Sequence, residues 1–255
     1  MDSFESPITA LVQGASRGIG LALVRRLVDA RGVSEVIATC RDPEHADDLR
    51  DLQAGGEERL TLVRLDATDE ASIEAAAREV GGIAPGLDLL INCAGLLHDG
   101  DEMRPERRLA DVDPGALARA FAVNASGPLL VAKHFEGLFD AKRRAVFASI
   151  SARVGSIGDN RLGGWYAYRA SKAAQNMITR NLSIELRRRH RGIICVAMHP
   201  GTVDTGLSKP FQSGVPEGKL FGTDRAADQL LSVIDGLVPQ SNGKFLAWDG
   251  SEIPW

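Results

Sequence analysis

One of the two tyrosines in the chain is spaced to share a helix face with a lysine. Tyr168 and Lys172 are four residues apart, so their side chains project from the same side of a helix, whereas Tyr166 is six residues from Lys172. A phenol acts as a general acid when its pKa falls from about 10 towards the working pH, and a nearby ammonium promotes that by stabilising the phenolate. The pair therefore indicates proton transfer by Tyr168, but this spacing also arises by chance and needs support from the rest of the chain.

Two serines and an asparagine precede this pair in the sequence. Ser149 and Ser151 come at the end of the predicted strand that begins with the apolar run 145–148. The two-residue period of a strand places both side chains on one face. A serine at the carboxyl edge of a parallel strand points into the ligand crevice, so we predict Ser151, nearer the edge, as the functional serine and keep Ser149 as the alternative. Asn124 is a poor helix former inside a predicted helix, and it either holds a water behind Lys172 or satisfies a backbone group.

A glycine-rich turn follows the first apolar run and opens the first amphipathic segment. Its sequence, Gly-Ala-Ser-Arg-Gly-Ile-Gly at 14–20, has the spacing G-x-x-x-G-x-G rather than the commoner G-x-G-x-x-G. Glycines remove side chains where a backbone must approach a pyrophosphate, and a helix N-terminus offers unpaired N–H groups and the positive end of its dipole. We therefore predict dinucleotide binding here and at the small residues after the fourth strand. The predicted contacts are Gly14, Ser16, Arg17, Gly18, Ile19, Gly20, Asn92, Ala94 and Gly95.

The residues after the second predicted strand bear on which nicotinamide cofactor is bound. Arg41 lies 21 residues after Gly20, where an acidic residue would bind a ribose 2′-hydroxyl and an arginine would accept a 2′-phosphate. Arg17 could reach the same group, while the neighbouring Asp42 could approach a hydroxyl instead, so NADP (NADPH) is the prediction and NAD the less favoured alternative. Asp66 ends the third predicted strand, and it either accepts a hydrogen bond from the adenine amino group or caps a loop.

Short β-rich runs alternate with longer segments of helical periodicity, and together they must position these residues. The seven predicted strands cover residues 8–12, 35–39, 60–63, 87–91, 145–148, 193–197 and 244–248. The predicted helices cover residues 19–30, 69–80, 114–138, 168–189 and 224–237. This alternation predicts an α/β fold, a single-domain doubly wound (Rossmann-type) parallel sheet of about seven strands with helices on both faces. The segment 202–223 has little regular pattern, and we expect a substrate lid there.

Composition and charge exclude several classes of function. The 255-residue chain is 44% hydrophobic with a net charge of −4, so it can bury a large core and is a poor candidate for binding nucleic acid or an anionic membrane. The basic run at 187–191 is interpreted as the last turn of a helix, where cations complement the dipole. Three distant cysteines predict neither a disulfide nor a metal site. Because a signal pattern and an apolar run of about 20 residues are both lacking, we expect a cytoplasmic protein.

Taken in order, these motifs resemble the short-chain dehydrogenase/reductase family over nearly the whole chain. The segment 155–172, the tripeptide His-Pro-Gly at 199–201 and the Trp-Asp-Gly at 248–250 are similar to its C-factor and sniffer-type carbonyl reductase branch. Two features depart from the family pattern. Cys93 stands where a second asparagine is usual, and the 17 residues from Ser151 to Tyr168 exceed the spacing in many members.

The resemblance implies NAD(P)-dependent chemistry between a small-molecule carbonyl and its alcohol. It implies that Tyr168 is the acid/base and that Lys172 binds the nicotinamide ribose. It further implies that Ser151 orients the carbonyl and that Asn124 supports a proton relay. The residues expected to contact the carboxamide are Pro200, Gly201, Val203 and Thr205. Relatives of this kind also lead us to expect a homodimer or homotetramer. Because the branch includes signalling proteins, an NADP(H)-binding signalling protein with vestigial catalysis is the alternative.

Overall fold

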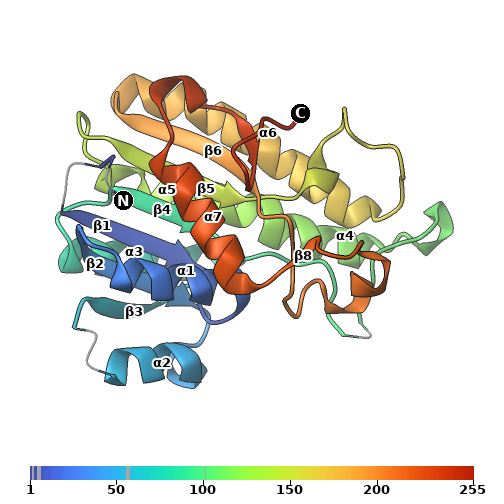
Figure 1. Cartoon of the computed structure of the whole chain (residues 1–255), viewed down its shortest axis with the longest axis horizontal. Coiled ribbons are helices and arrows are strands. Elements are labelled where there is room, and N and C mark those ends of the chain that lie inside the picture. The colour runs from blue at the N-terminus through green and yellow to red at the C-terminus, as the bar shows by residue number, and fades with distance from the viewer. Residues whose placement is uncertain (2, 5–6, 56–57, 101) are drawn as a thin grey trace.

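A central sheet organises the computed structural model, which describes residues 1, 3–4, 7–55, 58–100 and 102–255. Seven parallel strands lie in the order β3-β2-β1-β4-β5-β6-β9 (Figure 1). Their bounds are β1 (Ile8–Gln13), β2 (Val33–Cys40), β3 (Leu60–Arg64), β4 (Leu89–Asn92), β5 (Ala145–Ile150), β6 (Ile193–His199) and β9 (Phe245–Ala247). The chain proceeds outward from β1 to β3 and then from β4 to β9 in the other direction, which confirms the predicted doubly wound sheet. In sheets of this kind, ligands bind outside the carboxyl ends of the strands at the point of reversal, which lies here between β1 and β4.

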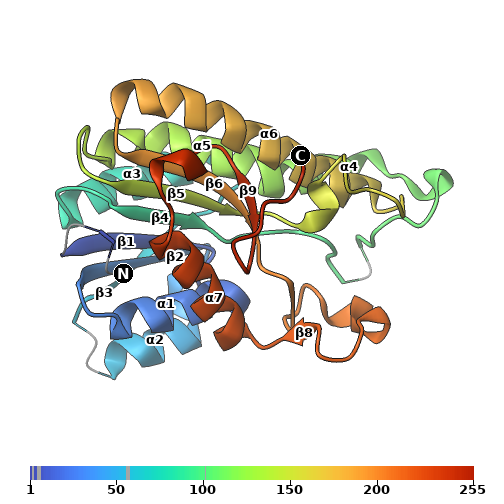
Figure 2. The ribbon, with the colours of Figure 1, turned by 45° about the horizontal axis from the view of Figure 1, so that its top comes forward.

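Helices cover both faces of the sheet (Figure 2). One layer contains α1 (Gly18–Asp29), α2 (Asp47–Ala54) and α7 (Thr223–Asp235). The opposite layer contains α3 (Glu70–Ile83), α4 (Pro114–Phe121), α5 (Gly127–Phe135) and α6 (Tyr166–Arg189). Because strands between two such layers are buried on both faces, β1 and β5 are nearly continuous apolar runs rather than alternating ones.

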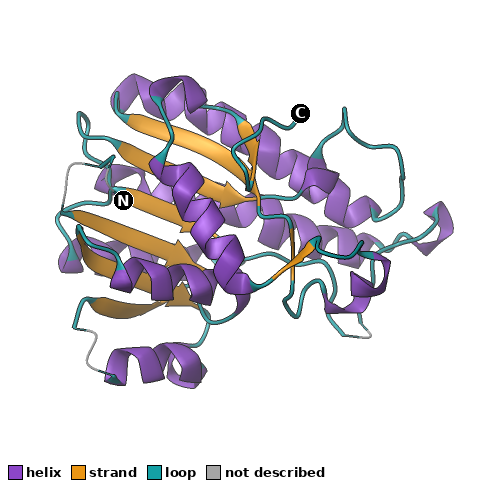
Figure 3. Cartoon of the chain, in the orientation of Figure 1, coloured by secondary structure: helices purple, strands orange, loops and turns teal. Residues whose placement is uncertain are grey.

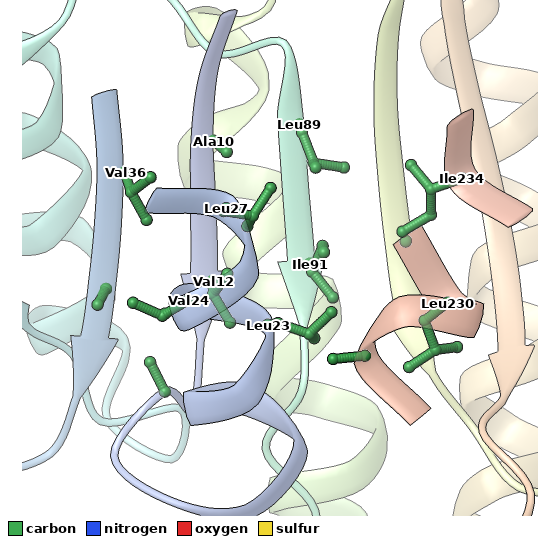
Figure 4. Close-up of a cluster of buried hydrophobic side chains, with 14 of the residues drawn as sticks. Ala10, Val12, Leu23, Val24, Leu27, Val36, Leu89, Ile91, Leu230 and Ile234 are labelled. Atoms are coloured by element: carbon green, nitrogen blue, oxygen red, sulfur yellow. The ribbon is translucent and has the colours of Figure 1, made fainter. Parts of the chain in front are cut away.

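The core on the α1 face fixes the helix that follows the glycine turn. Leu23, Val24 and Leu27 of α1 are fully buried against β1, β2 and β4, and Leu230 and Ile234 of α7 pack in the same cluster (Figure 4). Full burial of a side chain of this size contributes about 1.5–3 kcal/mol. The start of α1 is therefore held against the carboxyl edge of the sheet by the packing of its later turns.

The predicted helix 114–138 is interrupted in the structure. It consists of α4, a π-helical turn at Ala122–Ser126, α5 and a final 3₁₀ turn at Glu136–Leu138. By length and composition alone this run matches a membrane-spanning helix, a test that core helices also pass. Val131 and Phe135 of α5 pack in the core on this face of the sheet. The π turn contains Asn124, and turns of this type often occur at functional sites.

Three smaller features complete the comparison with the sequence. Prediction from sequence misses α2, because its one buried residue, Leu49, gives no apolar stripe. The prediction for α6 is confirmed at its end, since residues 187–189 form its last turn. The predicted lid segment lies outside the main sheet, and it contains a 3₁₀ helix at Lys209–Gly214 and the short paired strands β7 (Thr202–Val203) and β8 (Leu220–Phe221) (Figure 3).

Candidate active site

The glycine turn connects β1 to α1 through backbone conformations that other residues rarely adopt. Gly14 and Gly18 have φ angles of 79° and 59°. A Cβ on Gly14 would lie 2.6 Å from the backbone nitrogen of Ala94, and a Cβ on Gly20 would collide with the Gly14 carbonyl oxygen. Arg17 precedes α1 without a side-chain cap, and the first turn has no acidic residue, so the helix presents N–H groups to an anion. This geometry fits a pyrophosphate.

Two arginines lie at the carboxyl edge of β1 and β2, beside this turn. Arg17 and Arg41 are both exposed. Asp42, the acidic alternative, accepts a hydrogen bond from the backbone N–H of His45 (3.3 Å) and pairs with the His45 ring (2.8 Å). The Asp42 carboxylate is therefore engaged in capping a short 3₁₀ turn, while both guanidinium groups face solvent where a 2′-phosphate is expected.

Asp66 caps the loop that follows β3. Its Oδ1 accepts hydrogen bonds from the backbone N–H (2.9 Å) and from the hydroxyl (2.7 Å) of Thr68. Partial burial raises the pKa of Asp66, but the Thr68 bonds and the charges of Arg41 and Arg64 outweigh that effect, so this pKa lies below its usual value. Of the two interpretations from sequence, the structure shows the loop cap, and adenine binding stays a prediction.

Lys172 is the least exposed charged side chain in the described part of the chain, at 2%. Its Nζ donates hydrogen bonds to the Ile150 carbonyl oxygen (2.8 Å) and to Oε1 of Gln175 (2.8 Å), which fixes the ammonium at the end of β5. The same atom lies 3.8 Å from the position that a Cβ on Gly95 would occupy, so it also borders the segment after β4. Burial lowers the pKa of Lys172 to about 7, because the low-dielectric surroundings disfavour its charged form.

Tyr168 lies one helical turn before Lys172 on α6, and 8% of its surface is exposed. The Lys172 Nζ lies 5.9 Å from the centroid of the Tyr168 ring, so the two side chains share the face predicted from their spacing. The lowering of the Tyr168 pKa expected from the ammonium does not appear, because burial dominates and raises this pKa above its usual value. The phenol is therefore protonated at neutral pH, the state in which it can give a proton to a substrate oxygen.

Both candidate serines direct their hydroxyl groups at neighbouring amides. Ser151 is 3% exposed and donates to Oδ1 of Asn176 on α6 (2.7 Å). Ser149 is 1% exposed and accepts a hydrogen bond from Nδ2 of Asn92 (3.5 Å). Within the described residues, no hydrogen bond joins either serine to Tyr168. A role for Ser151 on a substrate carbonyl therefore requires its hydroxyl to leave Asn176.

Asn124 is fully buried in the π turn between α4 and α5. Its Oδ1 accepts a hydrogen bond from the backbone N–H of Leu96 (2.8 Å), and its Nδ2 donates to the Leu96 carbonyl oxygen (2.8 Å). Nδ2 also donates to Oγ of Ser171 on α6 (3.0 Å). These bonds tie the segment after β4 to α6. The structure thus shows the backbone-satisfying interpretation of Asn124, and its water-holding role stays a prediction.

The segment 202–223, predicted as a lid, lies close to the glycine turn and to the segment after β4. A Cβ on Gly18 would lie 3.4 Å from the Thr205 methyl group, and a Cβ on Gly95 would lie 3.8 Å from Leu207. Further along the lid, the centroid of the Phe211 ring lies 5.0 Å from that of Trp165. The lid therefore contacts the glycine turn, the segment after β4 and the start of α6. The residues expected to contact a carboxamide lie directly after β6 and in the first part of the lid: Pro200, Gly201, Val203 and Thr205.

Four further side chains lie around the Tyr168–Lys172 pair and were not predicted from the sequence: Gln175, Asn176, Trp165 and Phe211. Gln175 and Asn176 follow Lys172 by three and four residues, so helical spacing was the signal that could have found them. Trp165 and Phe211, by contrast, meet between segments without a periodic pattern, and no local signal predicts their contact.

Comparison with known proteins identifies the family to which this fold and this site belong. The family model described as short chain dehydrogenase matches residues 8–215, so the chain belongs to the short-chain dehydrogenase family. It is accordingly an NAD(P)-dependent oxidoreductase. Its relatives and structural neighbours further show a branch of the family that resembles carbonyl reductases, which confirms the resemblance drawn from the motifs.

Two relatives and two solved structures illustrate this position. A 1-hydroxy-2-glutathionyl-2-methyl-3-butene dehydrogenase of Rhodococcus sp. (strain AD45) is 33% identical over 97% of this chain and 99% of its own length. The C-signal protein of Myxococcus xanthus is 42% identical over 58% of this chain and 83% of its own length. The NADPH-bound carbonyl reductase from chicken fatty liver has 33% identity and a TM-score of 0.88, over 99% of this chain and 96% of that one. The carbonyl reductase Sniffer of D. melanogaster has 27% identity and a TM-score of 0.86, over 98% of this chain and 100% of that one.

Proposed function

We propose that the protein is an NADPH-dependent reductase of a small-molecule carbonyl compound. The observation that carries this proposal is a buried, protonated Tyr168 one helical turn from the buried Lys172, at the sheet edge where the glycine turn opens. The glycine turn fits a dinucleotide, because it leaves backbone N–H groups and no side chains at the start of α1. When bound, the reduced cofactor supplies the hydride. The similarity to the NADPH-bound carbonyl reductase from chicken fatty liver supports this cofactor and this substrate class.

In this proposal the side chains act on one carbonyl group. The carbonyl carbon accepts the hydride and the carbonyl oxygen accepts the Tyr168 proton, so an alcohol forms. Lys172 binds the cofactor ribose, and Asn124 supports the return of a proton to Tyr168. Ser151 exchanges its bond to Asn176 for one to the carbonyl oxygen, and the lid keeps water away from the site.

The direct test is NADPH oxidation in the presence of a panel of aldehydes, ketones and quinones, followed by absorbance of the reduced cofactor. We expect at least one class to be reduced at a rate well above the substrate-free control. The alcohol product, identified by mass spectrometry, must form in the same amount as the cofactor consumed. A protein that binds NADPH tightly but reduces no carbonyl contradicts the proposal.

Arg41 is expected to set the preference for NADPH over NADH. A charge-assisted hydrogen bond contributes about 1.5–3 kcal/mol, so Arg41→Asp should weaken NADPH binding by about 10- to 100-fold and leave NADH binding nearly unchanged or improved. Fluorescence titration with both cofactors measures the effect. Arg187→Asp makes the same charge change at the far end of α6 and should leave both affinities as they are. Equal losses for the two cofactors in Arg41→Asp would contradict a 2′-phosphate contact.

A second function is favoured by one observation, the match to the C-signal protein. In this alternative the protein binds NADP(H), its output is association with another protein, and its catalysis is vestigial. The carbonyl panel separates the two functions. Tight NADPH binding without turnover of any carbonyl supports the signalling alternative, whereas turnover supports the reductase.

We also propose a homodimer or homotetramer that uses the outer faces of α5 and α6. Large apolar side chains on these helices are exposed, including Leu129 at 42%, Met177 at 61% and Ile184 at 48%. Their burial between subunits would remove apolar surface from water. Light scattering should give at least twice the chain mass of 27.3 kDa, and a value near 27.3 kDa would contradict this assembly.

A further inference from the structure

The helix that carries Tyr168 does not cap its own N-terminus. Trp165, the residue before α6, provides no side-chain cap, and the first turn contains no acidic residue. Trp165 has φ 51° and ψ 46°, and it is the one non-glycine residue with positive φ in the described part of the chain. The first N–H groups of a helix need acceptors from elsewhere, and a left-handed conformation is strained for a bulky residue. Because Tyr168 is the third residue of α6, whatever holds this turn also holds Tyr168.

Glu106 supplies the missing cap from the loop that follows β4. Its carboxylate accepts a hydrogen bond from the backbone N–H of Ala167, with distances of 3.2 Å to Oε1 and 3.3 Å to Oε2. Its carbonyl oxygen accepts a hydrogen bond from the backbone N–H of Trp165 (2.6 Å). One residue therefore holds the backbone on both sides of Tyr166, and the carboxylate lies at the positive end of the helix dipole.

The burial of Glu106 is unusual for a carboxylate outside the predicted site. It is 4% exposed, and among the charged side chains of the described residues only Lys172 is less exposed. Burying a carboxylate is costly unless hydrogen bonds compensate, so such a group is retained where its position matters. Glu102, four residues earlier in the same loop, has a side chain that is 79% exposed and pairs with Arg119 on α4 (3.4 Å).

The same contacts extend from Glu106 to the lid. The Trp165 ring lies 6.3 Å from the Tyr168 ring and 5.0 Å from the Phe211 ring, measured between centroids. The loop that carries Glu106 also contains His98, whose Nε2 lies 3.1 Å from the Gly206 carbonyl oxygen in the lid. Glu106 holds the backbone of Trp165, and the Trp165 ring packs against the rings of Tyr168 and Phe211. The position of Trp165 therefore affects both the proposed proton donor, Tyr168, and the lid.

We propose that Glu106 is a positioning residue that fixes the first turn of α6, and with it the Tyr168 hydroxyl, for proton transfer. This inference rests on the proposed reductase function. Loss of the cap should leave cofactor binding intact, because the glycine turn lies on other elements and Lys172 is held by its own bonds to Ile150 and Gln175. It should displace Tyr168 from the reacting oxygen. Small displacements of a reacting group can cost about 100-fold in rate.

The test compares Glu106→Ala, Glu106→Gln and the exposed control Glu102→Ala. We expect Glu106→Ala to lower kcat by about 10- to 100-fold, with KM and the NADPH Kd changed by less than about twofold. Glu106→Gln should recover kcat to within about threefold of the wild type, because the amide oxygen can still accept from the Ala167 N–H. Glu102→Ala should match the wild type. Equal losses in the Gln and Ala variants, or an unchanged kcat in Glu106→Ala, would overturn the proposal.

Amide hydrogen exchange provides a readout that does not depend on activity. In Glu106→Ala, peptides covering 166–170 should exchange at least about tenfold faster, while peptides covering 180–189 should exchange at the wild-type rate. Unchanged exchange at 166–170 would overturn the cap itself. If the wild-type protein reduces no carbonyl, the proposed function fails, and exchange still reports whether Glu106 holds this turn. If the alanine variant does not fold, Glu106→Met replaces it, because methionine has a similar size and no carboxylate acceptor; it must show faster exchange at 166–170 than the wild type, and a wild-type rate there would overturn the proposal.

Discussion

Replacement of Tyr168 by phenylalanine is expected to lower kcat for carbonyl reduction by about 10²- to 10⁴-fold, the usual contribution of a positioned proton donor. This loss corresponds to about 3–5 kcal/mol of transition-state stabilisation. The variant retains the aromatic ring, whose centroid lies 6.3 Å from that of Trp165, so the packing at the start of α6 should persist. Steady-state kinetics with NADPH and a reducible carbonyl measure the loss. Fluorescence titration should show an NADPH Kd within about twofold of the wild type.

Tyr166→Phe is the matched control for this variant. This substitution also removes one phenol hydroxyl group, two residues away on the same helix. The Tyr166 side chain, however, is 40% exposed and lies on a different helical face from Lys172. The control should therefore keep wild-type kinetics. Full reductase activity in Tyr168→Phe, with normal NADPH binding, would refute the role of Tyr168 as proton donor.

The parts of the site that depend on local rules could be predicted from the sequence. Tyr168 and Lys172 share a face because they are four residues apart on one helix, and this relation needs no knowledge of the tertiary fold. The glycine turn is similar, since the need for positive φ at Gly14 and Gly18 follows from a tight strand-to-helix turn. The sheet order was also predictable in outline, because continuous apolar strands alternating with helices are typical of a parallel sheet.

The parts that depend on contacts between distant segments could not be predicted. Glu106 reaches Ala167 across 61 residues, and the intervening chain contains no pattern that relates the two. The direction of the Ser151 hydroxyl depends on Asn176, and strand periodicity places a side chain on a face without naming its partner. The direction of the Tyr168 pKa shift was also not predictable. The sequence suggests a neighbouring ammonium, which lowers this pKa, but it does not show the burial, which raises the pKa and outweighs that effect.

Replacement of Lys172 by methionine should abolish most of the activity and at the same time make the protein's stability less dependent on pH. Burial lowers the pKa of Lys172 from 10.5 to about 7, so between these values the unfolded chain binds a proton that the folded chain does not. Stability of the wild type therefore rises with pH across this window, and the full cost of the buried ammonium applies below pH 7. Methionine carries no charge and removes this cost, although it leaves the Ile150 carbonyl and the Gln175 amide without their donor.

Urea unfolding of both proteins near pH 6 and near pH 9.5 isolates the contribution of this one group. The stability of Lys172→Met relative to the wild type should fall by about 3 kcal/mol between the two pH values, because one pKa unit corresponds to 1.36 kcal/mol and the lost donor costs the same at both. Lys133→Met is the control, since its side chain is 61% exposed and pairs with Glu70 at the surface. Its difference from the wild type should vary little with pH. A Lys172→Met difference that is equally flat would show that the ammonium is not desolvated, and the account of a buried, neutralisable lysine beside Tyr168 would then fail.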